Sequence, residues 1–348
     1  MQAAQHHIHL EYYIYEDDHI GQLLADTMIQ KAQEGVTVRF IYDDFGSSGI
    51  RKKLVKRLRA GGVQAHPFSR ITFVALANRL NYRNHRKIIV IDGHTAFVGG
   101  INVSDKYINK AGQQQQYWRD THLKLIGAGA AYLQYLFLCD WNFCAAAQLQ
   151  PNAEFFPPTQ TLPTKGNKII QIAASGPDSD NPTILYSLLQ SIGLATRELL
   201  ITTPYFIPGE SLLDALIIAA MSGVRVKLLV PGQSDSLVVS AASRSYYADL
   251  LHAGVEIYQY QKGFIHAKTM VIDRKVAIVG TANMDQRSFD LNFEVNAVIY
   301  DSEFATQLSE VFNQDLAHAQ RIDPALWAQR SLSARFLEQT LRLISPIL

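Results

Sequence analysis

The sequence predicts an α/β protein of two similar lobes, each a mixed β-sheet flanked by helices. Segments with the period-two pattern of strands and segments with the period of helices follow one another along the chain, which is the pattern of α/β folds. A β-rich stretch also occurs twice, as NHRKIIVIDGHTAFVGGIN from Asn84 and as GFIHAKTMVIDRKVAIVGTAN from Gly263. Such self-similarity indicates an internal repeat, so each half of the chain is expected to form the same structural unit.

Both copies carry a His-Lys-Asp pattern that continues to a Gly and an Asn at matching distances. The shared residues are His85, Lys87, Asp92, Gly99 and Asn102 in the first copy, and His266, Lys268, Asp273, Gly280 and Asn283 in the second. A lone histidine on a strand is usually structural. Two aligned copies, each followed by the same Gly and Asn, instead indicate that both copies serve one chemical function.

Length and composition allow this organisation and restrict the function. The chain has 348 residues, enough for two domains with cores, and its 32 basic and 31 acidic residues leave a net charge of +1. The strongly basic balance of many nucleic-acid-binding proteins is therefore missing. Cys139 and Cys144 suggest neither a disulfide framework nor a zinc cluster. We expect them to be buried, reduced thiols.

The first half predicts a strand-helix-strand start and a β-hairpin around the first motif. Asp43 to Ser48 follows the second strand, so Asp43 and Ser47 are candidate substrate contacts at the carboxyl end of the sheet. A plain turn is the alternative. The expected elements are a strand at 7–15, a helix at 20–33, a strand at 36–42, a helix at 50–60, a hairpin at 87–91 and 95–98, a strand at 117–125 and a helix at 128–143.

Pro151 to Lys165, which has four prolines and no periodicity, is the expected linker. The predicted domains are therefore 1–150 and 166–348, with 151–165 between them. The second half repeats the plan. Its expected elements are a strand at 199–203, the PYFIP loop with Tyr205, a helix at 211–221, a strand at 224–230, a helix at 244–251 and a strand at 255–258.

Three segments are candidates for contact with a membrane. They are the insertion from Pro67 to Leu80, the basic face from Arg51 to Arg59 and the amphipathic stretch from Arg330 to Ile344. The basic face also fits an ordinary solvated helix surface. For the C-terminal stretch we expect packing on the core, with Arg330, Arg335 and Arg342 on its polar side, rather than lipid binding.

The residue types of the motif suit phosphoryl transfer. Positions i and i+2 of a strand share a face, so each His is expected beside its Lys, whereas the Asp lies at the hairpin turn and is assigned a structural, hydrogen-bonding role. A neutral imidazole attacks phosphorus and forms a phosphohistidine, while a protonated imidazole gives its proton to the leaving alcohol. Lys87, Lys268, Asn102 and Asn283 would hold the non-bridging oxygens, and the chemistry needs no metal or other cofactor.

Each histidine also needs an acceptor for its other ring proton. Asp120 and Glu294, in the strands after the two motifs, are the candidate orienting acids. The alternative is an ordinary strand-edge carboxylate in a salt bridge. The symmetry of the sequence does not decide which histidine is the nucleophile.

HRKIIVID and HAKTMVID resemble the two HxKxxxxD motifs of the phospholipase D superfamily. GGINVSDKY, WRDTHLKLIG, TPYFIP and GTANMDQRSFDLNFEVN are similar to bacterial cardiolipin synthases. The resemblance implies two phospholipase D-like lobes with the active site at the lobe interface. It implies transfer of a phosphatidyl group from one phosphatidylglycerol to another with release of glycerol, with His85 as nucleophile and His266 as acid/base. We add Tyr205 and Ser288, which lie in these stretches, as weaker candidates for substrate contact.

The resemblance also implies partners and a location. We expect phospholipid substrates, above all phosphatidylglycerol, a membrane surface and no nucleic acid; the sequence does not indicate an oligomeric state. No apolar run approaches the roughly 20 residues of a membrane span, although members of this family usually begin with one or two. We therefore expect a protein of the bacterial inner membrane, peripheral or anchored by an N-terminal segment missing from this chain, with its catalytic part on the cytoplasmic side.

Other functions remain open at the level of the sequence. A hydrolase of the phospholipase D type would use the same catalytic residues with water as acceptor. Phosphatidylserine synthase is a second transferase, a nuclease is disfavoured by the absence of a basic stripe with interleaved aromatics, and an inactive lipid-binding module is disfavoured by the two intact motifs.

Overall fold

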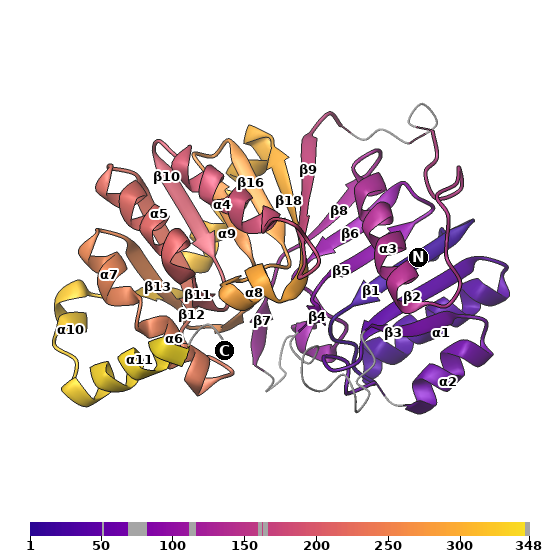
Figure 1. The fold of residues 1–348 in the computed structure, drawn as a ribbon, viewed down its shortest axis with the longest axis horizontal. Coiled ribbons are helices and arrows are strands. Elements are labelled where there is room, and N and C mark those ends of the chain that lie inside the picture. The colour runs from indigo at the N-terminus through magenta and orange to yellow at the C-terminus, as the bar shows by residue number, and fades with distance from the viewer. Residues whose placement is uncertain (51, 69–81, 111–115, 159–161, 163–165, 345–348) are drawn as a thin grey trace. The chain divides into compact units, whose positions relative to one another are not determined.

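The computed structural model describes residues 1–50, 52–68, 82–110, 116–158, 162 and 166–344. They form two compact units (Figure 1). The first unit is built from 1–110 and 122–167, and the second from 111–121 and 168–348. Residues 69–80 of the predicted insertion from Pro67 to Leu80 and part of the predicted linker lie outside the described residues.

The first unit is a mixed sheet of six strands in the order β3-β2-β1-β5-β6-β8. Strands β1, β2 and β3 are parallel to one another, and β5, β6 and β8 continue the sheet as antiparallel neighbours. Its elements are β1 (His7–Tyr12), α1 (His19–Gln33), β2 (Thr37–Asp43), α2 (Lys52–Ala60), β3 (Gln64–Phe68), β4 (Arg83–Asn84), β5 (Lys87–Ile91), β6 (Thr95–Gly99), a short 3-10 helix (Asp105–Tyr107), β8 (His122–Ile126) and α3 (Ala130–Cys144).

Strand β1 is buried on both faces because helices cover both sides of this sheet. Ile8 and Leu10 belong to the apolar core under α1 and α2. His7 and His9 point to the opposite face, where each has a ring nitrogen 3.1 Å from Oε1 of Gln134 on α3. The alternation therefore predicts the strand correctly, and the polar side chains are buried because α3 supplies their partners.

The second unit repeats this order of strands. Its sheet runs β19-β13-β12-β10-β15-β16-β18, with β9 paired to β18. Strands β10, β12 and β13 are parallel, whereas β15, β16 and β18 are antiparallel neighbours, as in the first unit. Its strands are β7 (Tyr117–Arg119), β9 (Ile169–Ser175), β10 (Glu198–Thr202), β11 (Phe206–Ile207), β12 (Arg225–Pro231), β13 (Glu256–Tyr260), β14 (Gly263–Ile265), β15 (Thr269–Ile272), β16 (Val276–Gly280), β17 (Met284–Asp285), β18 (Asn292–Tyr300) and β19 (Ala319–Arg321).

Helices cover both faces of this second sheet as well. They are α4 (Thr183–Gly193), α5 (Gly209–Met221), α6 (Leu237–Arg244), α7 (Tyr247–His252), α8 (Gln286–Asp290), α9 (Ser302–Leu316), α10 (Pro324–Ala328) and α11 (Leu332–Ile344). Two mixed sheets with the same pairing pattern confirm the predicted fold class of two similar α/β lobes. In both units, three parallel strands continue into three antiparallel strands, so the two lobes share one topology.

Three local predictions are wrong. The expected strand at 117–125 is two strands, β7 and β8, which belong to different units. The expected helix at 244–251 is the end of α6 followed by α7. Both cysteines are free, as expected, but Cys139 is exposed and Cys144 half-buried on the outer part of α3. Alternation and helical period do not reveal a break of one or two residues within a continuous pattern.

Candidate active site

The two motif histidines lie in short breaks between strands. His85 stands between β4 and β5, and His266 stands between β14 and β15. The prediction that each His lies within a strand is therefore wrong. The prediction that each Lys lies beside its His holds, because Nζ of Lys87 and of Lys268 donates to the carbonyl oxygen of the paired histidine at 2.6 Å in both copies.

His266 has a defined partner at each ring nitrogen. Its Nδ1 lies 2.8 Å from Oδ2 of Asp120, and its Nε2 lies 2.9 Å from Nζ of Lys268. A carboxylate accepts and an ammonium donates, so Nδ1 carries the proton and Nε2 presents its lone pair. All three side chains are buried, which strengthens these charge-assisted interactions. Nε2 is therefore the atom of His266 that can exchange a proton.

Strand β7 brings Asp120 to this histidine. It pairs in parallel with β14, with Ile265 opposite Arg119, and His266 N donates to the Arg119 carbonyl at 2.7 Å. Gly263 permits the pairing, because a Cβ there would lie 2.1 Å from the carbonyl oxygen of Tyr117. Arg119 fixes the strand further, since its Nε donates to Asp315 of α9 at 2.9 Å. The approach of two backbones thus sets the position of the carboxylate.

The orienting acid of His266 follows the other motif in the sequence. Asp120 comes after the first copy, yet residues 116–121 are part of the second unit and serve the second histidine. Glu294 lies on β18, fully buried, where it accepts from Thr281 Oγ1 and, at 3.3 Å, from Nδ2 of Asn292. The order of residues along the chain does not predict that Asp120 orients His266, because this contact depends on the pairing of β7 with β14.

Lys268 has a pKa close to neutrality. Burial lowers the pKa of its ammonium group to about 8, although the nearby carboxylates of Asp120 and Glu294 favour the charged form. A void of about 10 Å³, close to the room one water needs, lies next to this side chain. Lys268 is therefore a cation that loses its charge under mildly alkaline conditions.

This pKa predicts an alkaline limit to activity. Raising the pH through about 8 removes the proton from Lys268, so kcat/KM is expected to fall with a midpoint near that value. A pH-rate profile of the purified protein, with lipid dispersed in detergent, measures this midpoint. Constant kcat/KM up to pH 10 would show that the positive charge of Lys268 does not support the reaction.

A network of buried polar groups surrounds His85. The Tyr13 ring meets the His85 ring edge-on, with centroids 4.7 Å apart. Asn84, the preceding residue, donates its backbone N–H to Asp43 at 3.1 Å and its side-chain amide to Glu11 at 3.2 Å. On the other side, Arg86 pairs with Asp140 at 2.6 Å. The chain is therefore tied down on both sides of the histidine.

Asp92 and Asp273 hold the hairpin turns, in agreement with the structural role expected for them. Both have positive φ angles, 51° and 52°, a conformation that Asp adopts more readily than most residues. Asp92 accepts from the backbone N–H groups of Gln5, His6 and His7 at 2.8–3.0 Å. Asp273 accepts from those of Thr196, Arg197 and Glu198 at 2.8–2.9 Å, and from the Thr196 hydroxyl. Each carboxylate thus joins its hairpin to the start of the neighbouring strand.

We expect Asp273→Asn to lower the free energy of unfolding by about 2 kcal/mol at pH 7, because an amide NH₂ would face backbone donors. Burial alone would raise the pKa of Asp273, but the hydrogen bonds from Thr196, Glu198 and Arg197 lower it to about 2. Because the pKa of Asp273 is lower in the folded state, its carboxylate stabilises the fold at pH values above the ordinary pKa of 3.8. This stabilisation is lost as the pH falls from 3.8 towards 2.

The difference between the unaltered chain and Asp273→Asn should therefore shrink on acidification below pH 4. Urea unfolding followed by circular dichroism at several pH values measures it. Asp214→Asn, at an exposed position of α5, is the matched control. A difference that does not depend on pH would contradict the assignment to this carboxylate.

Comparison with known proteins agrees with this architecture. The family described as "Cardiolipin synthase, PLD-like domain" matches residues 1–117 and 188–316. Over its whole length the chain is 44% identical to the cardiolipin synthase of Geobacillus thermodenitrificans (strain NG80-2), of which it covers 69%. It is 42% identical to cardiolipin synthase 1 of Bacillus anthracis, again covering 69%. The chain belongs to the cardiolipin synthase family of the phospholipase D superfamily.

Solved structures show the same fold. Phosphatidylserine synthase of Haemophilus influenzae Rd KW20 superposes with a TM-score of 0.76 at 15% identity, over all of this chain and 91% of that one. Polyphosphate kinase of Porphyromonas gingivalis gives a TM-score of 0.59 at 12% identity, over all of this chain and 50% of that one. At these identities the likeness concerns the fold alone.

The two asparagines predicted from the internal repeat have internal partners. Asn102 accepts from Ile14 N at 3.2 Å and donates to the Tyr107 hydroxyl at 3.0 Å. Asn283 is buried, and its backbone N–H donates to the Ser288 hydroxyl at 3.2 Å. The two asparagines thus occupy corresponding places in the repeat but have different local contacts.

The weaker candidates for substrate contact also bond within their own unit. Asp43 accepts from the N–H groups of Phe45 and Gly46, and Ser47 donates to the Tyr13 carbonyl at 2.9 Å. Ser288 is fully buried. Tyr205 is half-buried and donates to Asp235 at 2.6 Å. Among these four, Tyr205 is the side chain with exposed surface and a polar group on that surface.

Sequence reasoning missed the polar residues that surround His85. Glu11 is fully buried, and burial together with the nearby Asp140 raises its pKa. The position of Glu11 in a strand with alternating apolar residues could have indicated these polar neighbours, because a carboxylate on a buried strand requires partners. Within the described ranges, no group of three or more His, Cys, Asp or Glu side chains is placed to hold a metal ion.

The described residues contain no helix that is both long and apolar enough to cross a membrane.

Proposed function

We propose that this phosphatidyltransferase of the cardiolipin synthase type uses both motifs in one two-step reaction at phosphorus. A ring nitrogen of His85 attacks the phosphorus of one phosphatidylglycerol, and the bond from phosphorus to the glycerol oxygen breaks. His266 gives its Nε2 proton to the departing glycerol. The free hydroxyl of a second phosphatidylglycerol then attacks the phosphohistidine, returns a proton to Nε2 and forms cardiolipin while the P–N bond breaks.

The observation that carries this proposal is the arrangement of Asp120, His266 and Lys268. Asp120 fixes the ring so that Nε2 is the reacting nitrogen. Nε2 presents a lone pair in the structure and takes up a proton before the first step, and the Asp120 carboxylate stabilises the doubly protonated ring that results. Lys268 lies 2.9 Å from the same nitrogen. A proton-transferring imidazole next to a buried cation suits the departure of an alkoxide from a charged phosphodiester.

The other motif residues receive supporting roles in the proposal. Lys87, Lys268, Asn102 and Asn283 stabilise charge on the non-bridging oxygens, and Glu294 is a further orienting acid. Asp92 and Asp273 act through the hairpin turns that they hold. The choice of His85 as nucleophile follows the family resemblance, and it is tested separately below.

The proposed substrates place the reaction at a membrane. Phosphatidylglycerol is the lipid donor and acceptor, and the protein works at the surface of the bacterial inner membrane, on the cytoplasmic side. The relatives named above are cardiolipin synthases of bacteria, which supports this location.

Analysis of products from head-group-labelled phosphatidylglycerol tests the reaction. Purified protein in detergent micelles or liposomes is expected to release labelled glycerol in step with the formation of cardiolipin. Phosphatidic acid as the main product would instead identify a hydrolase of the phospholipase D type. Transfer to added serine in preference to glycerol hydroxyls would identify phosphatidylserine synthesis.

A further inference from the structure

The C-terminal helix α11 is docked through the side that holds Ala334, Glu338 and Leu341. Glu338 in the middle of the helix is only 4% exposed, and its carboxylate accepts from Nη1 of Arg330 at 2.6 Å and pairs with Nε of Arg244 on α6 at 3.4 Å. Ala334 and Leu341, which share this side of the helix, are half-buried. The expectation that the C-terminal stretch packs on the core is therefore confirmed for this side of α11, where Leu341 packs against the apolar core of the second unit.

The apolar side of α11 faces outwards. Leu332, Phe336 and Leu343 are 80%, 76% and 83% exposed, and their spacing places them along one side of a helix. Leu326 on the preceding helix α10 is also exposed. Scattered apolar side chains are common on protein surfaces, but three large ones on one side of a helix docked by a buried carboxylate indicate a contact surface.

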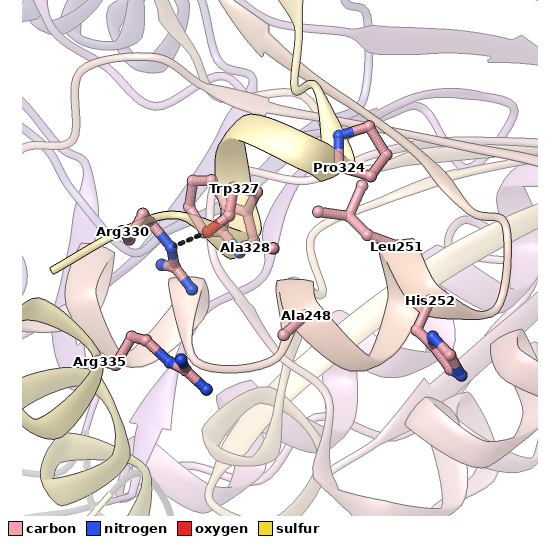
Figure 2. Close-up of a pocket in the computed structure, with 8 residues that line it drawn as sticks. All are labelled: Ala248, Leu251, His252, Pro324, Trp327, Ala328, Arg330 and Arg335. Atoms are coloured by element: carbon pink, nitrogen blue, oxygen red, sulfur yellow. Dashed lines mark hydrogen bonds between the residues drawn. The ribbon is translucent and has the colours of Figure 1, made fainter. Parts of the chain in front are cut away.

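Positive charge accompanies this apolar row. The charged residues of α11 are Arg335, Glu338 and Arg342. Glu338 is buried and Arg342 pairs with Asp249 at 2.9 Å, so Arg335 carries the exposed positive charge of this helix. Arg335 borders a pocket of about 460 Å³ between α7, α10 and the start of α11 (Figure 2). The pocket is lined chiefly by Leu251, His252, Pro324, Trp327, Arg330 and Arg335.

The charges of this pocket suit an anionic group. The described residues that line it include no carboxylate, and Figure 2 shows Arg330 and Arg335 on one side and His252 on the other. Arg330 is held in place because it stacks on Trp327 at 3.6 Å and donates to the Trp327 carbonyl and Glu338. Arg335 makes no ion pair with another described residue, so its guanidinium is available to a phosphate.

We propose that α11 is an interfacial helix that binds the surface of a membrane containing anionic phospholipids. The row Leu332–Phe336–Leu343 enters the boundary between headgroups and acyl chains, and Arg335 at the pocket pairs with a lipid phosphate. Two copies of the chain joined symmetrically through this row would bring the same positive side chains together, which disfavours self-association. The inference goes beyond the proposed reaction and depends on it only for the choice of lipid.

Sedimentation with vesicles tests the proposal on the full chain. The protein is expected to bind vesicles of phosphatidylglycerol and phosphatidylcholine, and to bind pure phosphatidylcholine vesicles more weakly. Leu332→Ser combined with Phe336→Ser should weaken binding by at least about tenfold, because two apolar side chains no longer leave water. Met221→Ser is the matched control, since Met221 on α5 is 75% exposed, like Phe336 at 76%.

The charge has a test of its own. Arg335→Gln should weaken binding to phosphatidylglycerol vesicles and leave binding to phosphatidylcholine unchanged, whereas Lys275→Gln, in an exposed turn, should change neither. The double serine variant is expected to keep full transfer activity towards lipid in detergent micelles. Loss of vesicle binding is therefore distinguishable from failure of the proposed chemistry.

Two results would overturn the proposal. One is vesicle binding by the double serine variant that equals binding by Met221→Ser. The other is a dimer, detected by sedimentation velocity without lipid, that the double serine substitution dissociates. The second result would assign the apolar row to a second copy of the chain.

Discussion

Replacing either His85 or His266 by alanine is expected to lower the rate of phosphatidyl transfer by about 10⁵-fold. The first variant loses the nucleophile, and the second loses the group that protonates the departing glycerol. Because both histidines serve one reaction, the double variant should be no slower than the slower single variant. Initial rates of cardiolipin formation in detergent micelles measure all three.

The loss of rate in the single variants shows whether the two motifs serve one reaction or two independent reactions. If each motif worked alone, each single variant would keep a large share of the activity, and only the double variant would be inactive. His19→Ala, at an exposed position at the start of α1, controls for the loss of an imidazole. Circular dichroism establishes that each variant is folded.

Asp120→Asn is expected to lower kcat by about 10³- to 10⁴-fold with little change in KM. The amide has nearly the shape of the carboxylate but lacks its charge, so it no longer stabilises the protonated ring of His266. It can also turn its NH₂ towards Nδ1, which would favour the tautomer with the proton on Nε2. Steady-state kinetics at several phosphatidylglycerol concentrations separate kcat from KM.

The control for this substitution is Asp214→Asn, which changes an exposed carboxylate on α5 in the same unit. A decrease in kcat smaller than tenfold for Asp120→Asn would mean that the 2.8 Å contact with His266 is not used in the reaction. A proportional rise in KM without a change in kcat would instead assign Asp120 to substrate binding.

The internal repeat predicts most of the fold because it fixes the topology twice. The motif copies predict two hairpins, and the structure contains them as β5–β6 and β15–β16, each beside the first parallel strand of its unit. The role of Asp92 and Asp273 is also predictable, because an Asp at a tight turn accepts backbone hydrogen bonds. The sequence is sufficient for the hairpins and for the turn positions, whereas the donors to the two carboxylates, at 5–7 and 196–198, come from distant parts of the chain.

The stretch YWRDTHLKL shows where sequence reasoning fails. Its alternation fits one strand, but the chain changes partners at Asp120 and Thr121, so that Tyr117–Arg119 pairs with β14 and His122–Ile126 with β6. Strand pairing is a tertiary choice that a pattern with a period of two does not contain. As a result, the acid that orients His266 precedes it by 146 residues.

The side of α11 that packs inwards is not predictable for a related reason. The helical period predicts an amphipathic helix, and the structure has one, but the period does not say which side packs inwards. Glu338 is buried on the packed side, with Ala334 and Leu341, because Arg330 and Arg244 pair with its carboxylate. The sequence does not show that these arginines, from the segment before α11 and from α6, lie opposite the same carboxylate.

Isolation of the covalent intermediate shows which histidine is the nucleophile. The protein and its two histidine variants are incubated with phosphatidylglycerol labelled in the phosphatidyl group, quenched in alkali to preserve phosphohistidine, digested and analysed by mass spectrometry. We expect phosphatidyl-His85 in the His266→Ala variant when the lipid carries an activated leaving group, and no adduct in the His85→Ala variant. An adduct on His266 in the His85→Ala variant, with none in His266→Ala, would contradict this assignment.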